Sequence, residues 1–329
     1  MRGHLWRPIA MAVAAIGFLA GCTPPFGLGQ PASRALERGA EESLSNSTSF
    51  EIKGSYSEGG VQWDIDLQTA PPQRQHVLLN GRNEPLEGIV IGDQAYYRGQ
   101  QFLAHHLGAD ALSQNLARAA GSSWWRGTVG YVPRLADLTT GAAFRAAFLG
   151  SAASRRTDHV SVDGVDAVEL SGQRADVYIA SAPPYRLLRL HMTKGVVIDG
   201  VAEGDLHYGS YDKDFGIAVP GDVIDFSNLS TLPPVYTVVS VDTSGCTSPC
   251  AVTAQLRNLG GMTGAKARST VTFTMTDAGS GRAIGSCQAT VSPDVGYNAT
   301  TTVGCTIPNV SGQQNAAIVT ATPDNPGRG

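Results

Sequence analysis

The chain has 329 residues, of which 42% are hydrophobic and 16% are charged, and its formal net charge is -4 at pH 7. It is too apolar to be wholly disordered and long enough for two ordinary domains. The isoelectric point is near 6.0 and no block of Lys and Arg occurs, which excludes nucleic acid as a partner because phosphate binding needs clustered cations. The 39 Gly and 18 Pro predict a folded, turn-rich and mostly β protein.

Residues 1–21 have the pattern of a lipoprotein signal peptide. Arg2 and Arg7 give a basic start, and the apolar stretch 9–20 is too short to span a bilayer as a stable helix. The next four letters, Leu-Ala-Gly-Cys at 19–22, resemble the lipobox of bacterial lipoproteins, whose Cys is acylated, for example with palmitate. We therefore predict lipidation of Cys22 and a cell-membrane location on the extracytoplasmic side. The alternative is an ordinary signal peptide followed by a chance cysteine.

The mature chain is expected to begin with a lipidated tether and a helix. Residues 22–32 contain three Pro and two Gly without any apolar period, as in a flexible linker. Residues 33–46 predict a helix with a Ser cap, because Leu36, Ala40 and Leu44 recur every four residues.

Strand-like alternation follows the first helix. Phe50, Ile52 and Tyr56 share one phase, and Trp63, Ile65 and Leu67 share the next. Further strands are predicted at 77–79, 88–98, 159–171, 175–180, 185–192, 196–200 and 205–211. Helical spacing of apolar residues interrupts them at 101–120 and 135–149. The fold class is therefore α+β, a large curved antiparallel sheet with a few helices over one face.

A composition break near residue 229 predicts a second domain. Residues 229–235 contain a Pro-Pro pair and form the expected hinge after a first domain at 33–228. Residues 236–329 are rich in Thr, Ser, Val and Gly, and we predict an immunoglobulin-like β-sandwich there. Its strands are predicted at 236–242, 250–257, 269–276, 282–291, 299–307 and 316–322. The segments "AQLRNLGG" and "STVTFTM" resemble those of bacterial immunoglobulin-like modules.

Four cysteines remain after Cys22, all in this second domain. An even number in an exported chain predicts disulfides. Cys287 and Cys305 are expected to face each other across neighbouring strands of one hairpin, and Cys246 with Cys250 would close a small loop. A metal site is the alternative, but the chain has no His after 207 and its Cys spacings do not fit a zinc site. We expect neither metal nor cofactor.

The first domain carries several short segments in a characteristic order. After the lipobox and the short helix come "SFEIKGSYSEGGVQWDIDLQ", "IVIGDQAYYRG", two helices, "VDGVDAVELSG" and "PYRLLRL". Over about residues 33–228 this order resembles the LppX/LprG-type lipoproteins of actinobacteria. The resemblance implies a LolA-like fold, a half-open barrel whose helices cover a hydrophobic cavity, and a lipid or glycolipid as the ligand. The second domain is a departure from that family.

A curved sheet with an apolar concave face offers a space for acyl chains wherever the covering helices do not fill it. Ten side chains are the candidate lining. They are Trp63, Ile65, Leu67, Tyr96, Leu112, Leu116, Trp124, Trp125, Phe144 and Phe148. Adjacent Trp124 and Trp125 should point in opposite directions. The alternative is that all ten belong to a closed core.

Catalysis is not expected. The triplet Asp214-Phe215-Gly216 lacks the other kinase motifs and predicts a turn, and adjacent His105 and His106 diverge on a helix. Asp64 and Asp66 alternate with apolar residues and predict a solvent-facing side of a strand. Two functions remain: a membrane-anchored lipoprotein that binds or transfers lipid, or a cavity-free interaction or sensory lipoprotein that meets an envelope protein partner.

Overall fold

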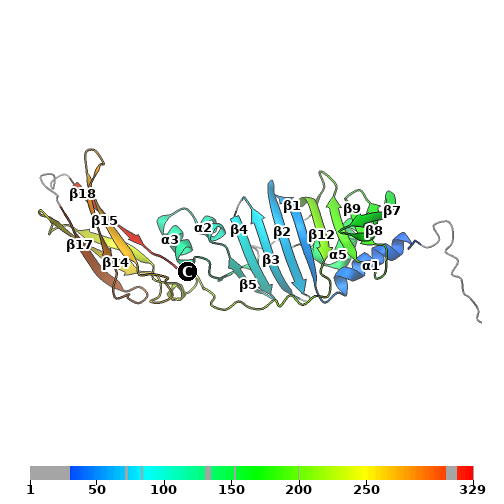
Figure 1. Ribbon diagram of the computed structural model, residues 1–329, viewed down its shortest axis with the longest axis horizontal. Helices are drawn as coiled ribbons and strands as arrows, with labels where there is room; N and C mark the ends of the chain where they lie inside the picture. Colours follow the sequence, from blue (N-terminus) through cyan, green and yellow to red (C-terminus); the bar gives the residue numbers. More distant parts are fainter. Residues whose placement is uncertain are drawn as a thin grey trace, which may run out of the picture.

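The structure is a computed structural model, and it is elongated, with one large sheet and two small ones (Figure 1). It describes residues 30–328 except 71–72, 83, 130–134, 152, 199 and 309–316. The predicted signal peptide and the predicted lipidation site Cys22 lie outside the described residues. No helix among the described residues is long and apolar enough to cross a membrane.

The large sheet has 12 strands, and its strand pairs are antiparallel. Their order is β6-β5-β4-β3-β2-β1-β12-β10-β9-β8-β7, with β11 beside β12. The strands are β1 (Phe50–Glu58), β2 (Val61–Ala70), β3 (Arg74–Gly81), β4 (Glu84–Ile91), β5 (Gln94–Arg98), β6 (Trp125–Gly127), β7 (Arg155–Val162), β8 (Val165–Ser171), β9 (Ala175–Ala180), β10 (Leu187–Met192), β11 (Val197–Ile198) and β12 (Val201–Gly209). The predicted large antiparallel sheet is confirmed.

Two segments that were each predicted as one strand contain two strands joined by a turn. The segment 88–98 holds the end of β4, a turn and β5, and 159–171 holds the end of β7, a turn and β8. Asp163 and Gly164 both have positive φ, 49° and 83°, as a two-residue hairpin turn requires. Apolar alternation continues through such a short turn, so periodicity alone does not reveal it.

The helices cover one face of the large sheet. They are α1 (Ser33–Ser45), α2 (Gln100–Leu107), α3 (Ala111–Ala120), α4 (Ala136–Thr139), α5 (Gly141–Phe144) and the π-helix η2 (Arg145–Leu149). The N-cap of α1 is Ala32, whose side chain makes no capping bond, so the predicted Ser cap is wrong.

The helix predicted at 101–120 is broken in two. Gly108 has a φ of 118°, and Asp110 starts a new helix by accepting a hydrogen bond from the Ser113 backbone N–H at 3.0 Å. The helix predicted at 135–149 is likewise split, into α4, α5 and η2.

The first of two apolar cores lies between the large sheet and these helices. It combines inward-facing strand residues such as Leu67, Val77 and Tyr97 with Leu103 of α2 and Phe144 of α5. Since successive strand residues point to opposite faces, the residues between them form an outer face, and none of the described helices covers it.

The second core lies between two three-stranded sheets, β13-β14-β17 and β16-β15-β18, which we call the C-terminal sandwich. The strands are β13 (Tyr236–Asp242), β14 (Cys250–Asn258), β15 (Thr270–Asp277), β16 (Ala283–Thr290), β17 (Thr300–Ile307) and β18 (Ala317–Asp324). All six were predicted within about two residues.

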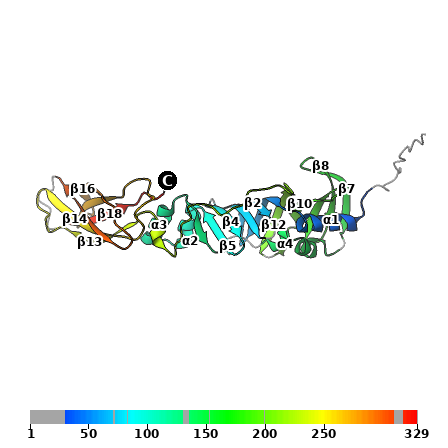
Figure 2. The same cartoon turned by 90° about the horizontal axis from the view of Figure 1, so that it is seen from below.

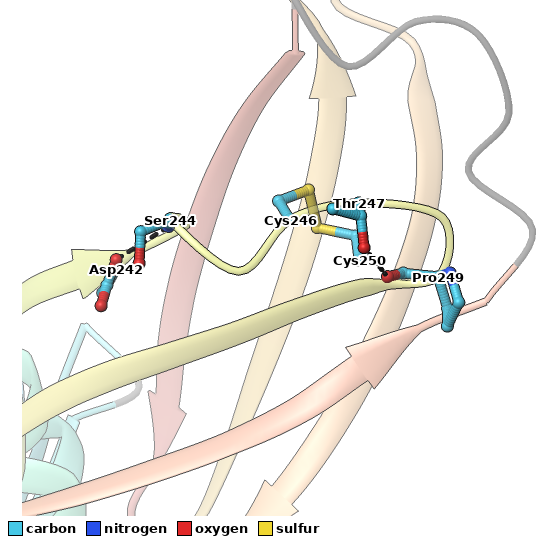
Figure 3. The surroundings of a disulfide bond; sticks show 6 residues. All are labelled: Asp242, Ser244, Cys246, Thr247, Pro249 and Cys250. Carbon is cyan, nitrogen blue, oxygen red and sulfur yellow. Dashed lines mark hydrogen bonds between the residues drawn. A yellow bond between two sulfur atoms is a disulfide. The ribbon is translucent and has the colours of Figure 1, made fainter.

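Both predicted disulfides are present. Cys246–Cys250 closes a tight loop between β13 and β14, with the two Cα atoms 3.9 Å apart (Figure 3). Cys287–Cys305 also forms, but the predicted hairpin is wrong, because β16 pairs with β15 and β17 pairs with β14. Each of the two cysteines points toward the core from an edge strand, and the two strands belong to different sheets. This disulfide therefore joins the two sheets along one side of the sandwich.

The two cores lie end to end along the molecule, as both views show (Figures 1 and 2). Residues 210–235 connect the two cores and run along the ends of the large-sheet strands (Figure 1). Ile224 of this segment is buried and bridges Trp125 of β6. After β18, the chain returns to α3, where the Arg328 N–H donates to the Ala119 carbonyl at 3.1 Å.

Candidate binding surfaces

The space between the large sheet and the short helices is the predicted lipid site. The apolar pocket found there has a volume of about 10 Å³. It is lined by Leu135, Asp137, Leu138, Phe148, Met192, Ile198 and Val201. Such a volume holds about one water molecule, whereas sites for small ligands usually span about 300–1,000 Å³. The described side chains that line this pocket leave too little space there for an acyl chain.

Five of the ten predicted lining residues belong to this packed core. They are Ile65, Leu67, Trp125, Phe144 and Phe148, each less than a tenth exposed. The Phe144 ring lies 5.1 Å from that of Phe148, and the Trp125 ring lies 5.1 Å from that of Tyr97. Trp63 and Leu116 pack against the same core and are partly buried.

The other three predicted residues do not join them. Leu112 is 42% exposed on α3. Tyr96 is buried on the outer face, opposite to its neighbour Tyr97, and its hydroxyl donates to Gln94 Oε1 at 2.6 Å. Trp124 lies under the Arg98 guanidinium, whose Cζ is 4.9 Å from the ring centre, while Trp125 is buried in the core. The two tryptophans therefore differ in environment.

The outer face of the large sheet holds a second candidate surface, a groove of about 440 Å³. One row of side chains crosses it from strand to strand, in the register Asp66–Leu78–Glu87–Arg98. A second row consists of Asp64, Asn80 and Pro85. We call these seven side chains the outer-face groove.

The charges at the two ends of the first row are paired. Glu87 accepts hydrogen bonds from Arg98 Nε at 2.8 Å and from His76 Nε2, whose contact is 2.9 Å. Burial raises the pKa of Glu87, but these bonds outweigh burial and hold it below its ordinary value. At the other end, Lys53 Nζ lies 3.4 Å from Asp66 Oδ2.

Asp66 is less well satisfied than Glu87. Its Oδ1 atom is buried and accepts no hydrogen bond from the described part of the chain. Burial raises the pKa of Asp66, and the Lys53 charge offsets only part of that effect. Because this oxygen is enclosed by the protein, it adds to the cost of burying Asp66 and not to the acceptors that the groove offers.

Sequence reasoning missed this groove. Asp64 and Asp66 were assigned to a solvent face, which is where the structure has them, but no hollow was expected. The signal lies in adjacent Leu78 and Leu79, because two neighbouring leucines on a strand cannot both face the core. Leu79 faces inward at 4% exposure, and Leu78 faces outward at 44%.

The residues considered as catalytic candidates make local structural contacts. His105 Nδ1 lies 3.0 Å from Glu84 Oε1 on the surface. Asp214 accepts a hydrogen bond from the Gly216 backbone N–H at 2.9 Å, as in a turn. No group of three or more His, Cys, Asp or Glu side chains in the described ranges is placed to hold a metal ion.

Comparisons with known proteins give little. No family model and no curated protein matches the chain. Two solved structures align at 12% identity over 87% of this chain and 97% of theirs: MucB in complex with MucA(peri), at a TM-score of 0.27, and the Pseudomonas aeruginosa MucA/MucB complex, at 0.26. At such TM-scores the likeness carries no inference.

Proposed function

We propose that this protein is a membrane-anchored interaction lipoprotein, which presents its outer sheet face and its C-terminal sandwich to a protein partner in the cell envelope. The observation that carries the proposal is the contrast between the two faces of the large sheet. The apolar face encloses a pocket of about 10 Å³, and the uncovered face has a groove of about 440 Å³. A packed core can support a binding surface, whereas a carrier needs a void.

Crosslinking in the native host tests this function. A photoreactive residue replaces Leu78 in the groove or, in parallel, Val165 at the far end of the sheet, where 43% of the side chain is exposed. We expect a protein adduct of one discrete mass from at least one of the two positions. The absence of any discrete adduct at both, together with one lipid per chain in an organic extract, would overturn the proposal.

Anchoring is the second part of the proposal. The lipobox pattern at 19–22 supports acylation of Cys22 and retention at the extracytoplasmic side of the cell membrane. Cys22→Ala should move the protein from the membrane fraction into the soluble fraction. Retention of this variant through detergent-free washes would contradict the lipid anchor.

Lipid binding in a LolA-like half-open barrel is the second candidate function, and one buried hydroxyl favours it. Tyr56 is fully buried on the core face, and its hydroxyl has no hydrogen-bond partner among the described residues. Tyr56 lies opposite the bulge of β12 that contains Gly204. Gly204 in turn lies next to Met192, which lines the apolar pocket. A bound head group would give this hydroxyl an acceptor.

The variant Tyr56→Phe separates the two functions. If no ligand binds, removal of an unsatisfied buried hydroxyl should stabilise the fold by about 1 kcal/mol. If lipid binds there, the variant should lose lipid recovered by organic extraction and mass spectrometry. Phe144→Asp should abolish that recovery while the fold persists, whereas a closed core should lose several kcal/mol in the same variant.

The C-terminal sandwich is proposed to be an immunoglobulin-like module. Its two packed three-stranded sheets and its intersheet disulfide support this, as does the Asn-led turn after β14. Such modules commonly present loops at their ends to partners.

A further inference from the structure

The outer-face groove has an unusual order of chemical groups. Along the cross-strand row, the sequence is cation, carboxylate, leucine, carboxylate, cation: Lys53, Asp66, Leu78, Glu87 and Arg98. Each end carboxylate already has a cation on its outer side, from Lys53 for Asp66 and from Arg98 for Glu87. Only the apolar side chain at the centre stands between the two carboxylates.

Leu78 is the apolar centre of this row of charged side chains. Its neighbours on both adjacent strands are charged, so it has no apolar cross-strand partner on the outer face, and 44% of its surface meets water. A single exposed apolar side chain is ordinary on a protein surface, so Leu78 matters here as an apolar floor flanked by charge, which suits the stem of a long cationic side chain.

The groove also has acceptors that a ligand can reach. The Asp66 side chain is 30% exposed, and because its Oδ1 atom is buried, the oxygen open to a ligand is Oδ2, which lies 3.4 Å from Lys53 Nζ. Asp64, on the same face, is exposed and forms no ion pair within the described ranges. With Lys53 beside Asp66, the side chains Asp64, Asp66 and Glu87 against Lys53 and Arg98 leave one net negative charge, which is that of Asp64.

We infer that the outer-face groove binds an arginine or lysine side chain of an extended segment of the partner protein, with its aliphatic stem on Leu78 and its cationic head on Asp64 and Asp66. Long cationic side chains cover apolar surface with their stems and keep the charge at the polar end, which matches the order of groups here. A guanidinium would supply two parallel donors to a carboxylate. The inference rests on the proposed function and names the chemistry of the partner.

A small inorganic cation or a polyamine fits less well. A bare cation makes no favourable contact with Leu78. A groove of about 440 Å³ also accommodates several consecutive side chains. A peptide in extended form alternates its side chains, so basic residues at every second position would face the sheet while apolar ones flank them.

Fluorescence anisotropy on the full mature chain tests the inference directly. The probe is a fluorescein-labelled Leu-Arg-Leu-Arg-Leu peptide, and its matched control replaces each Arg with the neutral isostere citrulline. We expect the Arg peptide to bind and the citrulline peptide to bind at least tenfold more weakly. Asp64→Asn with Asp66→Asn should weaken the Arg peptide about tenfold, because each lost charged contact counts in affinity.

A charge-matched control removes two carboxylates elsewhere on the same sheet, with Asp163→Asn and Asp176→Asn near β8 and β9. This double variant should bind the Arg peptide as the wild type does. Leu78→Lys should eliminate binding, because its own ammonium would lie between the two groove carboxylates. Equal loss in both double variants would mean that general negative charge attracts the peptide, and the inference would fail.

Crosslinking distinguishes failure of this inference from failure of the proposed function. If a discrete partner adduct forms and persists in the Asp64→Asn, Asp66→Asn variant, the interaction function stands and the groove is not its site. If the adduct disappears only in that variant, the groove is the site. If spermidine displaces the Arg peptide completely at equal charge concentration, a polyamine is the better ligand and the peptide inference is wrong.

Discussion

At the scale of single residues, one buried amide holds the turn after β14. Asn258 is fully buried, and its Oδ1 accepts hydrogen bonds from the backbone N–H groups of Val235 and Gly260, both at 2.9 Å. Its Nδ2 donates to the carbonyls of Gly261 and Val295. This side chain thus links the segment before β13 with the loops that follow β14 and β16.

Asn258→Ala should therefore destabilise the C-terminal sandwich by about 3 kcal/mol, because it leaves two buried N–H donors without an acceptor. Urea unfolding measures the change. Asn228→Ala is the matched control, since Asn228 accepts only local, exposed hydrogen bonds from Ser230. It should cost less than about 1 kcal/mol, and an equal cost for both variants would show that burial of the amide is not what matters.

We predict that a lysine in place of Leu78 stabilises the fold, although it replaces an apolar side chain on a strand. Leu78→Lys would place an ammonium directly between Asp66 and Glu87, its cross-strand neighbours. Opposite charges on adjacent strands contribute about 0.2–1 kcal/mol, so thermal unfolding should shift upward. Leu78→Glu should shift it downward by a similar amount. A loss of stability in the Lys variant would contradict the assignment of Leu78 to the solvent side.

Asp66 gives a pH dependence with a defined sign. Burial raises the pKa of Asp66 in the folded chain, so the folded state binds its proton more tightly than the unfolded state does. The stability contributed by this group is then present at acid pH and is lost as pH rises through the raised pKa. At neutral pH, the free energy of unfolding of Asp66→Asn should therefore equal that of the wild type or exceed it by up to ~0.5 kcal/mol. This advantage of the variant should disappear on acidification.

Lys53 is not left unpaired in the Asp66→Asn variant, because its Nζ also lies 3.0 Å from Glu51. Denaturant unfolding at neutral and acid pH provides the measurement. If the advantage of the variant grows on acidification, the sign of the Asp66 shift is wrong.

At the scale of elements, the two disulfides close loops of different size. Cys287 and Cys305 are 18 residues apart in the chain, and Cys246 and Cys250 are 4 apart. Chain-entropy reasoning gives about 3 kcal/mol for the longer loop and about 2 kcal/mol for the shorter one. The longer one also joins edge strands of different sheets, which share no backbone ladder.

Paired Cys→Ala variants should therefore rank in that order. Loss of Cys287–Cys305 should lower the free energy of unfolding of the sandwich more than loss of Cys246–Cys250. Trp fluorescence follows the large-sheet core alone, since all four Trp lie before residue 229, and a transition seen by circular dichroism but not by Trp fluorescence reports the sandwich. A larger cost for the short loop would show that local strand geometry outweighs loop closure here.

The elements themselves were largely predictable from local patterns. Alternating residues in β1, β2 and the C-terminal strands, and four-residue spacing in α1 to α3, come directly from the sequence. What local pattern lacks is long-range pairing: nothing in the alternation around Cys287 or Cys305 says that their strands belong to different sheets. The outer-face groove is missed for the same reason, because Asp66, Leu78 and Glu87 become neighbours only through the strand register.

At the scale of the whole molecule, the chain returns after β18 to contact both cores. The Arg328 side chain is only 15% exposed and pairs with Asp222, and its Nη2 donates to the Thr231 carbonyl at 2.9 Å. Its backbone N–H donates to Ala119 of α3. Gly327 is required beside it, with a φ of 70° and the Arg118 carbonyl 2.3 Å from where a Cβ would stand.

These contacts form a strap that fixes the C-terminal sandwich against α3 and the segment 210–235. A strap of this kind would hold the outer-face groove and the sandwich in one orientation, so that a partner meets both together. Binding through two linked surfaces gains affinity only when their geometry permits simultaneous contact. Orientation is therefore a functional property of this molecule under the proposed interaction function.

Arg328→Ala should weaken the strap, because it removes the contacts with Asp222 and the Thr231 carbonyl and keeps the backbone bond to Ala119. Loss of a part-buried hydrogen bond from a charged donor costs about 2 kcal/mol, which shifts the equilibrium between strapped and released forms roughly 30-fold. Small-angle X-ray scattering should then report a broader distribution of distances between the two cores, while the unfolding of each core stays unchanged. Arg282→Ala, which removes an exposed cation from the sandwich, is the control. Identical scattering for the Arg328 variant and the wild type would mean that residues 210–235 alone set the orientation.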